Sequence, residues 1–165
     1  MKSRTSSAFR PMVKTALVVG LLAIASSSVA DAQPKKQPAA PTVECTLYEV
    51  SLENTKTPKV DADLKPLEKK LAKPPFSSWN TQTKLTISTK TLEKTKPEAY
   101  PVKVGKASIM FDSMASKSQV TLAIQIDNGA GKRILDTKIN ISGADFFMTS
   151  REEGKTQHLL ALTCK

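Results

Sequence analysis

The stretch that decides the fold is SQVTLAIQIDNGAGKRILDTKINIS, residues 118–142. In its first ten residues, apolar side chains alternate with smaller or polar ones, which is the period-two pattern of a strand with one buried face. Asn128-Gly129-Ala130-Gly131 then provides residues that tolerate positive φ, and predicts a hairpin loop. A second alternating run predicts the partner strand. The residues expected to share a face are Val120, Leu122, Ile124 and Ile126 in the first strand, and Leu135, Thr137, Ile139 and Ile141 in the second.

Six further segments have strand-like patterns and are separated by turn residues. With the hairpin they amount to seven or eight short strands, which predicts an all-β fold, a small antiparallel β-sandwich. An open β-barrel is the alternative. The segments are VECTLYEVSL (43–52), TKLTISTKTL (83–92), YPVKV (100–104), ASIMFDS (107–113), ADFFMTS (144–150) and TQHLLALTC (156–164).

One helical segment interrupts the strands, in DADLKPLEKKLAKPP (61–75). Three leucines recur there at helical spacing and two prolines end the run, so we expect one short capping helix near 64–73. A helix of about two turns is unstable alone and must pack against the sandwich. The leucines are Leu64, Leu67 and Leu71.

Trp79, the only tryptophan of the chain, follows this helix in PPFSSWN (74–80). One interpretation is that it joins Phe76 and the leucines in covering an open end of the sandwich, because large aromatic side chains are mostly buried. The other interpretation is that Trp79 is exposed and recognises a sugar or a partner protein. We favour the first.

The first 32 residues have the layout of a cleaved secretory signal peptide. Their apolar run (16–25) has about 10 residues, far fewer than the roughly 20 of a membrane-spanning helix. The next stretch, 33–42, is rich in Pro, Ala and Lys and predicts a disordered leader. We therefore expect a single sandwich domain over 43–165 and no transmembrane segment after cleavage. The protein should be secreted, either periplasmic or extracellular.

Cys45 and Cys164 are the only cysteines and lie near the two ends of the expected domain. Because an exported protein meets an oxidising compartment, we expect a disulfide between them. Such a bond requires neighbouring Cα atoms, which makes the first and last strands neighbours. Two cysteines without a nearby histidine do not fill a zinc site, so neither a metal nor another cofactor is predicted.

The chain is basic, with 25 Lys and Arg against 15 Asp and Glu. Without residues 1–32 its net charge is about +7, and its arginines are then Arg133 and Arg151. Lysine lacks the planar fork with which arginine grips bases and phosphates, so sequence-specific nucleic-acid binding is not expected. Diffuse attraction to an anionic envelope polymer is the functional interpretation of the charge, and solubility is the plainer one.

The leading hypothesis is a non-catalytic exported domain that binds an envelope component or another exported protein. Contacts are expected from the lysine-rich helix, from Trp79, and from the strand at 83–92. In that strand, alternation predicts that the side chains of 84, 86, 88 and 90 point the same way. The candidate binding residues are Lys69, Lys70, Lys73, Trp79, Lys84 and Lys90, with Thr86 and Ser88 on the same strand face.

Two alternative functions stay open. A small secreted hydrolase would use His158, the only histidine, which strand parity places on the face of Leu160, Leu162 and Cys164. An assembly module would instead accept a partner strand at an exposed sheet edge, which uncharged edge residues favour and lysines oppose. No local spacing marks a nucleophile for the histidine. The hydrolase would otherwise rely on carboxylates near strand ends: Asp112, Asp127, Asp136 and Asp145.

Overall fold

The structure is a computed structural model that describes residues 40–103, 105–116 and 118–165. The expected signal peptide (1–32) and residues 33–39 of the expected leader lie outside the described residues. Ordered strand structure begins at Thr42, the last residue of that leader.

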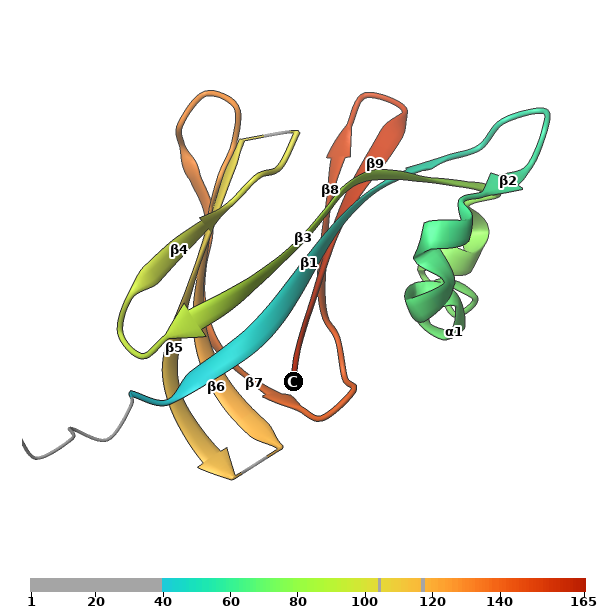
Figure 1. Cartoon of the computed structure of the whole chain (residues 1–165). Helices are drawn as coiled ribbons and strands as arrows, with labels where there is room; N and C mark the ends of the chain where they lie inside the picture. Colours follow the sequence, from blue (N-terminus) through green and yellow to red (C-terminus); the bar gives the residue numbers. More distant parts are fainter. Residues whose placement is uncertain (1–39, 104, 117) are drawn as a thin grey trace, which may run out of the picture. The chain divides into compact units, whose positions relative to one another are not determined.

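Two sheets form a small all-β sandwich, as the strand patterns predict (Figure 1). Neighbouring strands run antiparallel, except for the parallel pair β2 and β3. The described strands do not close into a barrel. The five-stranded sheet has the order β2 (Lys59–Val60), β3 (Thr81–Glu93), β1 (Thr42–Glu53), β9 (Thr156–Cys164) and β8 (Phe147–Glu153). The four-stranded sheet has the order β4 (Pro97–Tyr100), β5 (Lys106–Ser116), β6 (Gln119–Asp127) and β7 (Arg133–Ser142).

The hairpin of β6 and β7 forms as residues 118–142 predict. Leu122 pairs with Ile139, and alternate side chains of both strands pack toward the other sheet. The side chain of Asn128 holds the loop by accepting hydrogen bonds from two loop amides, at 2.9 and 3.0 Å. Gly131 has a φ of 77°, which a residue without a Cβ adopts without strain.

Two predicted strands begin or end elsewhere. The strand expected at 100–104 is wrong: β4 ends at Tyr100, and Pro101 has no N–H with which to continue a ladder. The strand expected at 144–150 begins only at Phe147. β2 has no counterpart in the prediction, because two residues are too few to carry a period-two pattern.

The core between the sheets is apolar and contains the disulfide. Cys45 of β1 lies opposite Cys164 of β9 and their sulfur atoms are bonded, so the two strands are neighbours as predicted. The disulfide is compatible with an exported protein. Fully buried side chains of this core include Leu92, Ile109, Phe111, Leu122 and Leu162.

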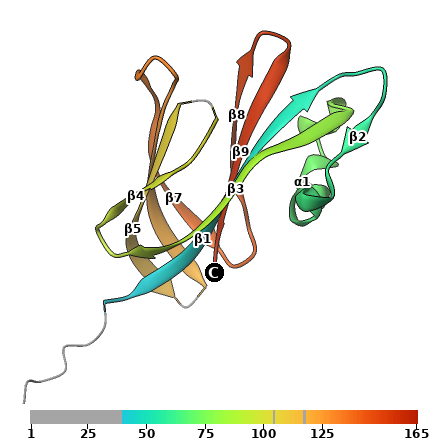
Figure 2. The ribbon, with the colours of Figure 1, turned by 45° about the horizontal axis from the view of Figure 1, so that its top comes forward.

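A helical segment covers the outer face of the five-stranded sheet, the face turned away from the other sheet (Figure 2). The predicted short helix is confirmed, although its first half is a 3₁₀-helix that contains Pro66. The segment comprises η1 (Ala62–Leu67), α1 (Glu68–Leu71) and η2 (Phe76–Ser78). Its three predicted leucines are buried against Tyr48, Val50, Leu52, Leu159 and Ala161.

Phe76 and Trp79 are half-buried and pack against the cluster that these leucines form with β1 and β9. The expectation that they join the leucines in a hydrophobic cluster is therefore confirmed. Their location is a correction: they cover the outer face of a sheet and not an open end of the sandwich. The reason is that β1 and β9 present apolar residues on both faces, so the outer face also needs a cover.

Candidate functional site

Lys84 and Lys90 lie on opposite faces of β3, which corrects the expectation of a single polar face. The register of β1 and β3 shifts at Leu85, which has no partner in β1. Such a β-bulge adds one residue and inverts the alternation of side chains. Thr86, Ser88 and Lys90 consequently share the inner face, whereas Lys84 lies on the outer face.

Lys84 joins β3 to the start of the helical segment. Its ammonium group forms an ion pair with Asp63, and its backbone N–H donates to Oδ2 of Asp61 at 2.9 Å. That backbone hydrogen bond, followed by the one from the Lys59 side chain, holds the pKa of Asp61 below its usual value. These contacts give Lys84 a structural role.

Lys90 points toward β4 on the inner side. Its Nζ lies 3.5 Å from Oε2 of Glu98 and 5.7 Å from the centroid of the Tyr100 ring. The Tyr100 hydroxyl donates to the backbone carbonyl of Cys45 at 3.2 Å. Burial raises the pKa of Tyr100 above its ordinary value of 10.0, and the nearby Glu98 adds to the shift.

The remaining candidate binding residues lie on the helical segment, the start of which Lys84 contacts. Lys69, Lys70 and Lys73 are exposed, and Lys70 lies 3.6 Å from Asp145. Trp79 is half-buried beside them in sequence. Lys90 therefore lies on the inner side of the five-stranded sheet and the other five predicted residues lie on its outer side, so the six do not form one site.

His158 lies on the inner face of β9 with Leu160, as parity predicts. Its Nε2 is 3.4 Å from Oε2 of Glu153, and its Nδ1 is buried without a hydrogen-bond partner among the described residues. Ser51 lies opposite His158 on β1, but its hydroxyl donates to Oε1 of Glu53 at 3.0 Å. The histidine is thus not in a hydrogen-bonded pair with this serine.

The four strand-end carboxylates lie away from His158 and are ion-paired at the surface. In the part of the chain that the structure describes, none of them lines the cleft that contains His158. Their partners are Lys138 for Asp112, Arg133 for both Asp127 and Asp136, and Lys70 for Asp145.

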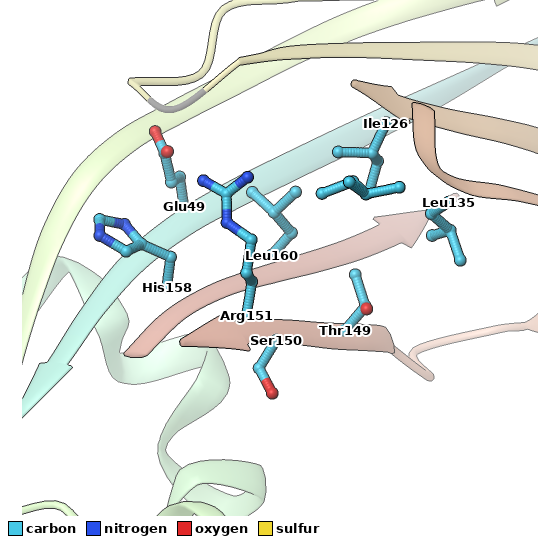
Figure 3. A pocket seen from close by; sticks show the side chains of 9 residues that line it. Glu49, Ile126, Leu135, Thr149, Ser150, Arg151, His158 and Leu160 are labelled. Carbon is cyan, nitrogen blue, oxygen red and sulfur yellow. The ribbon is translucent and has the colours of Figure 1, made fainter. Parts of the chain in front are cut away.

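A cleft of about 280 Å³ opens between the two sheets where β7, β8 and β9 come together (Figure 3). One end of it is polar and carries the side chains of Glu49, Arg151 and His158. The other end is apolar and includes Ile126 and Leu135 (Figure 3). The remaining lining residues are Ile134, Thr149, Ser150 and Leu160.

Glu49 explains why the sheets do not pack tightly at this end. Its carboxylate is buried, and it accepts hydrogen bonds from the Thr86 hydroxyl at 3.2 Å and from the Lys103 backbone amide at 2.6 Å. Arg151 brings the opposite charge and contacts Glu153 through Nη2 at 3.6 Å. Both signs of charge are therefore present at the polar end.

The four edge strands differ in how strongly they resist pairing with another chain. β2 has two residues, and β4 has four and begins with Pro97. β8 has seven residues and carries Arg151, Glu152 and Glu153 at one end. Short strands, prolines and charges are the usual protections of a sheet edge. β7 carries Arg133, Asp136 and Lys138 and a β-bulge at Ile134, which has no partner in β6, but with ten residues it is the longest of these edges.

β7 leaves apolar side chains partly uncovered. Leu135 and Ile139 face the other sheet but are only half-buried. The first cleft lies beside Leu135, and a second, of about 370 Å³, is lined by 139–142 and 145–147. We call residues 134–142 together with these two clefts the β7 groove.

Sequence analysis missed Glu49, Arg151 and the edge position of β7. Glu49 had a signal, because it is a charged residue at the parity of the buried Leu47. Arg151 falls just beyond the predicted strand 144–150. The edge position had no signal, because strand order is not encoded in the pattern of one strand.

Comparisons with known proteins add no relative. The sequence matches no protein-family model, and a search of curated proteins finds no match. Within the described ranges, no helix is long and apolar enough to span a membrane. The same ranges contain no group of three or more His, Cys, Asp or Glu side chains placed to hold a metal ion. The candidate site therefore depends on geometry alone.

Proposed function

We propose that this chain is an exported, non-catalytic binding module that takes up an extended segment of another protein at the β7 groove. The observation that carries the proposal is the ten-residue edge of β7, which has no neighbouring strand on its outer side among the described residues and whose inward apolar side chains are only half-buried. In strand addition, main-chain hydrogen bonds provide affinity and pockets for alternate side chains provide specificity. The groove offers both.

The charge of the first cleft favours side chains of a protein over an anionic polymer. Glu49 and Arg151 supply both signs of charge at its polar end. A polar side chain of a bound segment suits this end better than an anionic polymer does.

Two observations support a non-catalytic function. The Ser51 hydroxyl donates to Glu53 and not to His158, whereas a serine nucleophile needs a hydrogen bond to its base. The strand-end carboxylates are occupied by surface ion pairs. Export is supported by the signal-like residues 1–32 and is compatible with the disulfide.

A synthetic strand tests the proposal. The probe is a capped heptapeptide that alternates valine and threonine and is N-methylated at every second amide, which leaves it one free edge and prevents fibrils. Isothermal titration calorimetry should detect binding to the wild-type protein. Thr137→Lys should weaken binding about tenfold or more, because an inward-pointing lysine blocks an added strand.

The matched control is Thr91→Lys, which adds the same charge at an exposed position of β3. This variant should bind the peptide like the wild type. Binding that is equal for Thr137→Lys, or equal for a peptide methylated at every amide, would refute strand addition at β7.

A further inference from the structure

We propose that the segment bound in the β7 groove is β7 of a second copy of this chain. The two β7 strands run antiparallel, with Thr137 opposite Thr137 of the second copy. This inference depends on the proposed strand addition at β7 and specifies the partner.

Symmetry restricts how two copies of one edge strand pair. An antiparallel pair of identical strands is related by a two-fold axis perpendicular to the sheet. Residues that lie opposite each other then have side chains on the same face, so even-numbered residues face even-numbered ones and odd face odd. The axis consequently passes midway between a residue and its own copy, which face each other.

The charges of β7 select the register. Asp136 faces Lys138 of the second copy only when the axis lies between Thr137 and its copy. The symmetry then forms this pair twice, once on each side of the axis. With the axis beside Asp136 or Lys138 instead, that residue would face the same residue of the second copy. Two like charges directly opposite each other on neighbouring strands are unfavourable. The register centred on Thr137 pairs residues 135–139 of the two copies, which all follow the bulge at Ile134 and therefore keep a regular alternation.

Both charges are available for a second copy. The side chain of Asp136 is 58% exposed and that of Lys138 is 61% exposed. Within the chain, Asp136 accepts from Arg133 at 2.9 Å and from Gln125 at 3.1 Å, and Lys138 donates to Asp112 at 3.1 Å, all at solvent-accessible positions. Such surface pairs hold side chains weakly. Asp136 and Lys138 can therefore join these pairs into a row of alternating charge across the interface.

The apolar side of the same register completes the core. Leu135 faces Ile139 of the second copy, and both residues are half-buried in one chain alone. The added strand covers the β7 groove of each copy and makes one continuous sheet from the two four-stranded sheets. The outer edges of that sheet are then the four-residue β4 strands with Pro97, which oppose further addition and close the assembly as a dimer.

Sedimentation equilibrium of the purified protein tests the inference through charge reversal. The wild type should show a reversible monomer–dimer equilibrium. Asp136→Lys and Lys138→Asp each convert two opposite-charge pairs into two like-charge pairs, so each should raise the dimer Kd about tenfold or more. In an equimolar mixture of the two variants, Asp136→Lys has lysine at positions 136 and 138, and Lys138→Asp has aspartate at both positions. The mixture should therefore form a heterodimer with nearly the wild-type Kd.

The control variants are Glu68→Lys and Lys69→Asp, which make the same charge changes at exposed positions of α1 and should dimerise like the wild type. Rescue on mixing also shows that the β7 variants are folded. A monomeric wild type, or a dimer that neither variant weakens, would overturn the inference. If the wild type is monomeric but binds the methylated peptide, strand addition at β7 stands and only the identity of the partner is wrong.

Discussion

At the residue scale, a few polar side chains decide where the two sheets meet and where they separate. Glu49 has an inward position in β1, and its carboxylate draws the Thr86 hydroxyl and the Lys103 amide toward the interior. A buried carboxylate requires such donors, because burial without them is costly. The residues around Glu49 are therefore polar, and the apolar contact between the sheets is interrupted there by the first cleft.

Tyr100 should make the stability of the fold sensitive to alkaline pH. Burial raises its pKa above 10.0, so above that pH the unfolded chain loses a proton that the folded chain retains. The free energy of unfolding should fall by up to about 1.4 kcal/mol per pH unit from this group, and be unaffected by it below pH 10. Urea unfolding of the wild type and Tyr100→Phe from pH 8 to 11 checks this. Parallel pH profiles of the two proteins would contradict it.

Trp79 should contribute to stability as a half-buried cover. Trp79→Ala should lower the free energy of unfolding by about 2 kcal/mol, less than the roughly 3–5 kcal/mol of a fully buried aromatic side chain. Val60→Ala is the control, because Val60 is 56% exposed and should change stability by less than about 0.5 kcal/mol. Urea unfolding gives both values. A neutral Trp79→Ala would favour the interpretation of Trp79 as an exposed recognition residue.

At the element scale, the strands and the short helix were predictable because their patterns are local. The alternation of 118–142 identifies β6 and β7, and the leucine spacing in 61–75 identifies the helical segment. The bulge at Leu85 was not predictable, because an extra residue leaves no mark on a run of threonines and lysines. Its effect is that Lys84 contacts the helical segment while Lys90 contacts β4.

The candidate site was less predictable than the elements that form it. The alternating pattern of β7 was visible in the sequence, but its edge position follows from the order of four strands. That order results from long-range packing and not from local preference. The lysines and Trp79 attracted attention as conspicuous residue types, and the structure divides them between the two sides of the five-stranded sheet.

At the scale of the whole molecule, two hydrophobic clusters lie on either side of the five-stranded sheet, and the disulfide joins the ends of β1 and β9 within it. Two sheets and a short helical cover form the sandwich that the composition and turn spacing predict. The positive charge is spread over several surfaces, and the groove beside β7 is the feature that a complete sandwich does not require.

The disulfide should supply a large share of the stability. It links residues separated by 119 positions, and the chain-entropy model assigns a loop of that size about 4–5 kcal/mol. Reduction should therefore lower the urea midpoint strongly or unfold the protein, and thiol titration should detect free thiols only after reduction. An unchanged midpoint in the fully reduced protein would contradict this prediction.

Nuclear magnetic resonance can show whether the β7 groove is the binding surface. The ¹⁵N-labelled protein is titrated with the valine–threonine heptapeptide that is N-methylated at every second amide. The changes in amide chemical shift are then mapped along the chain. The largest shifts should occur in 134–142 and in the β8 and β9 residues of the first cleft. Shifts centred on 62–79, or no shifts at all, would contradict it, and the former would return the lysine-rich helical segment and Trp79 to the position of candidate site.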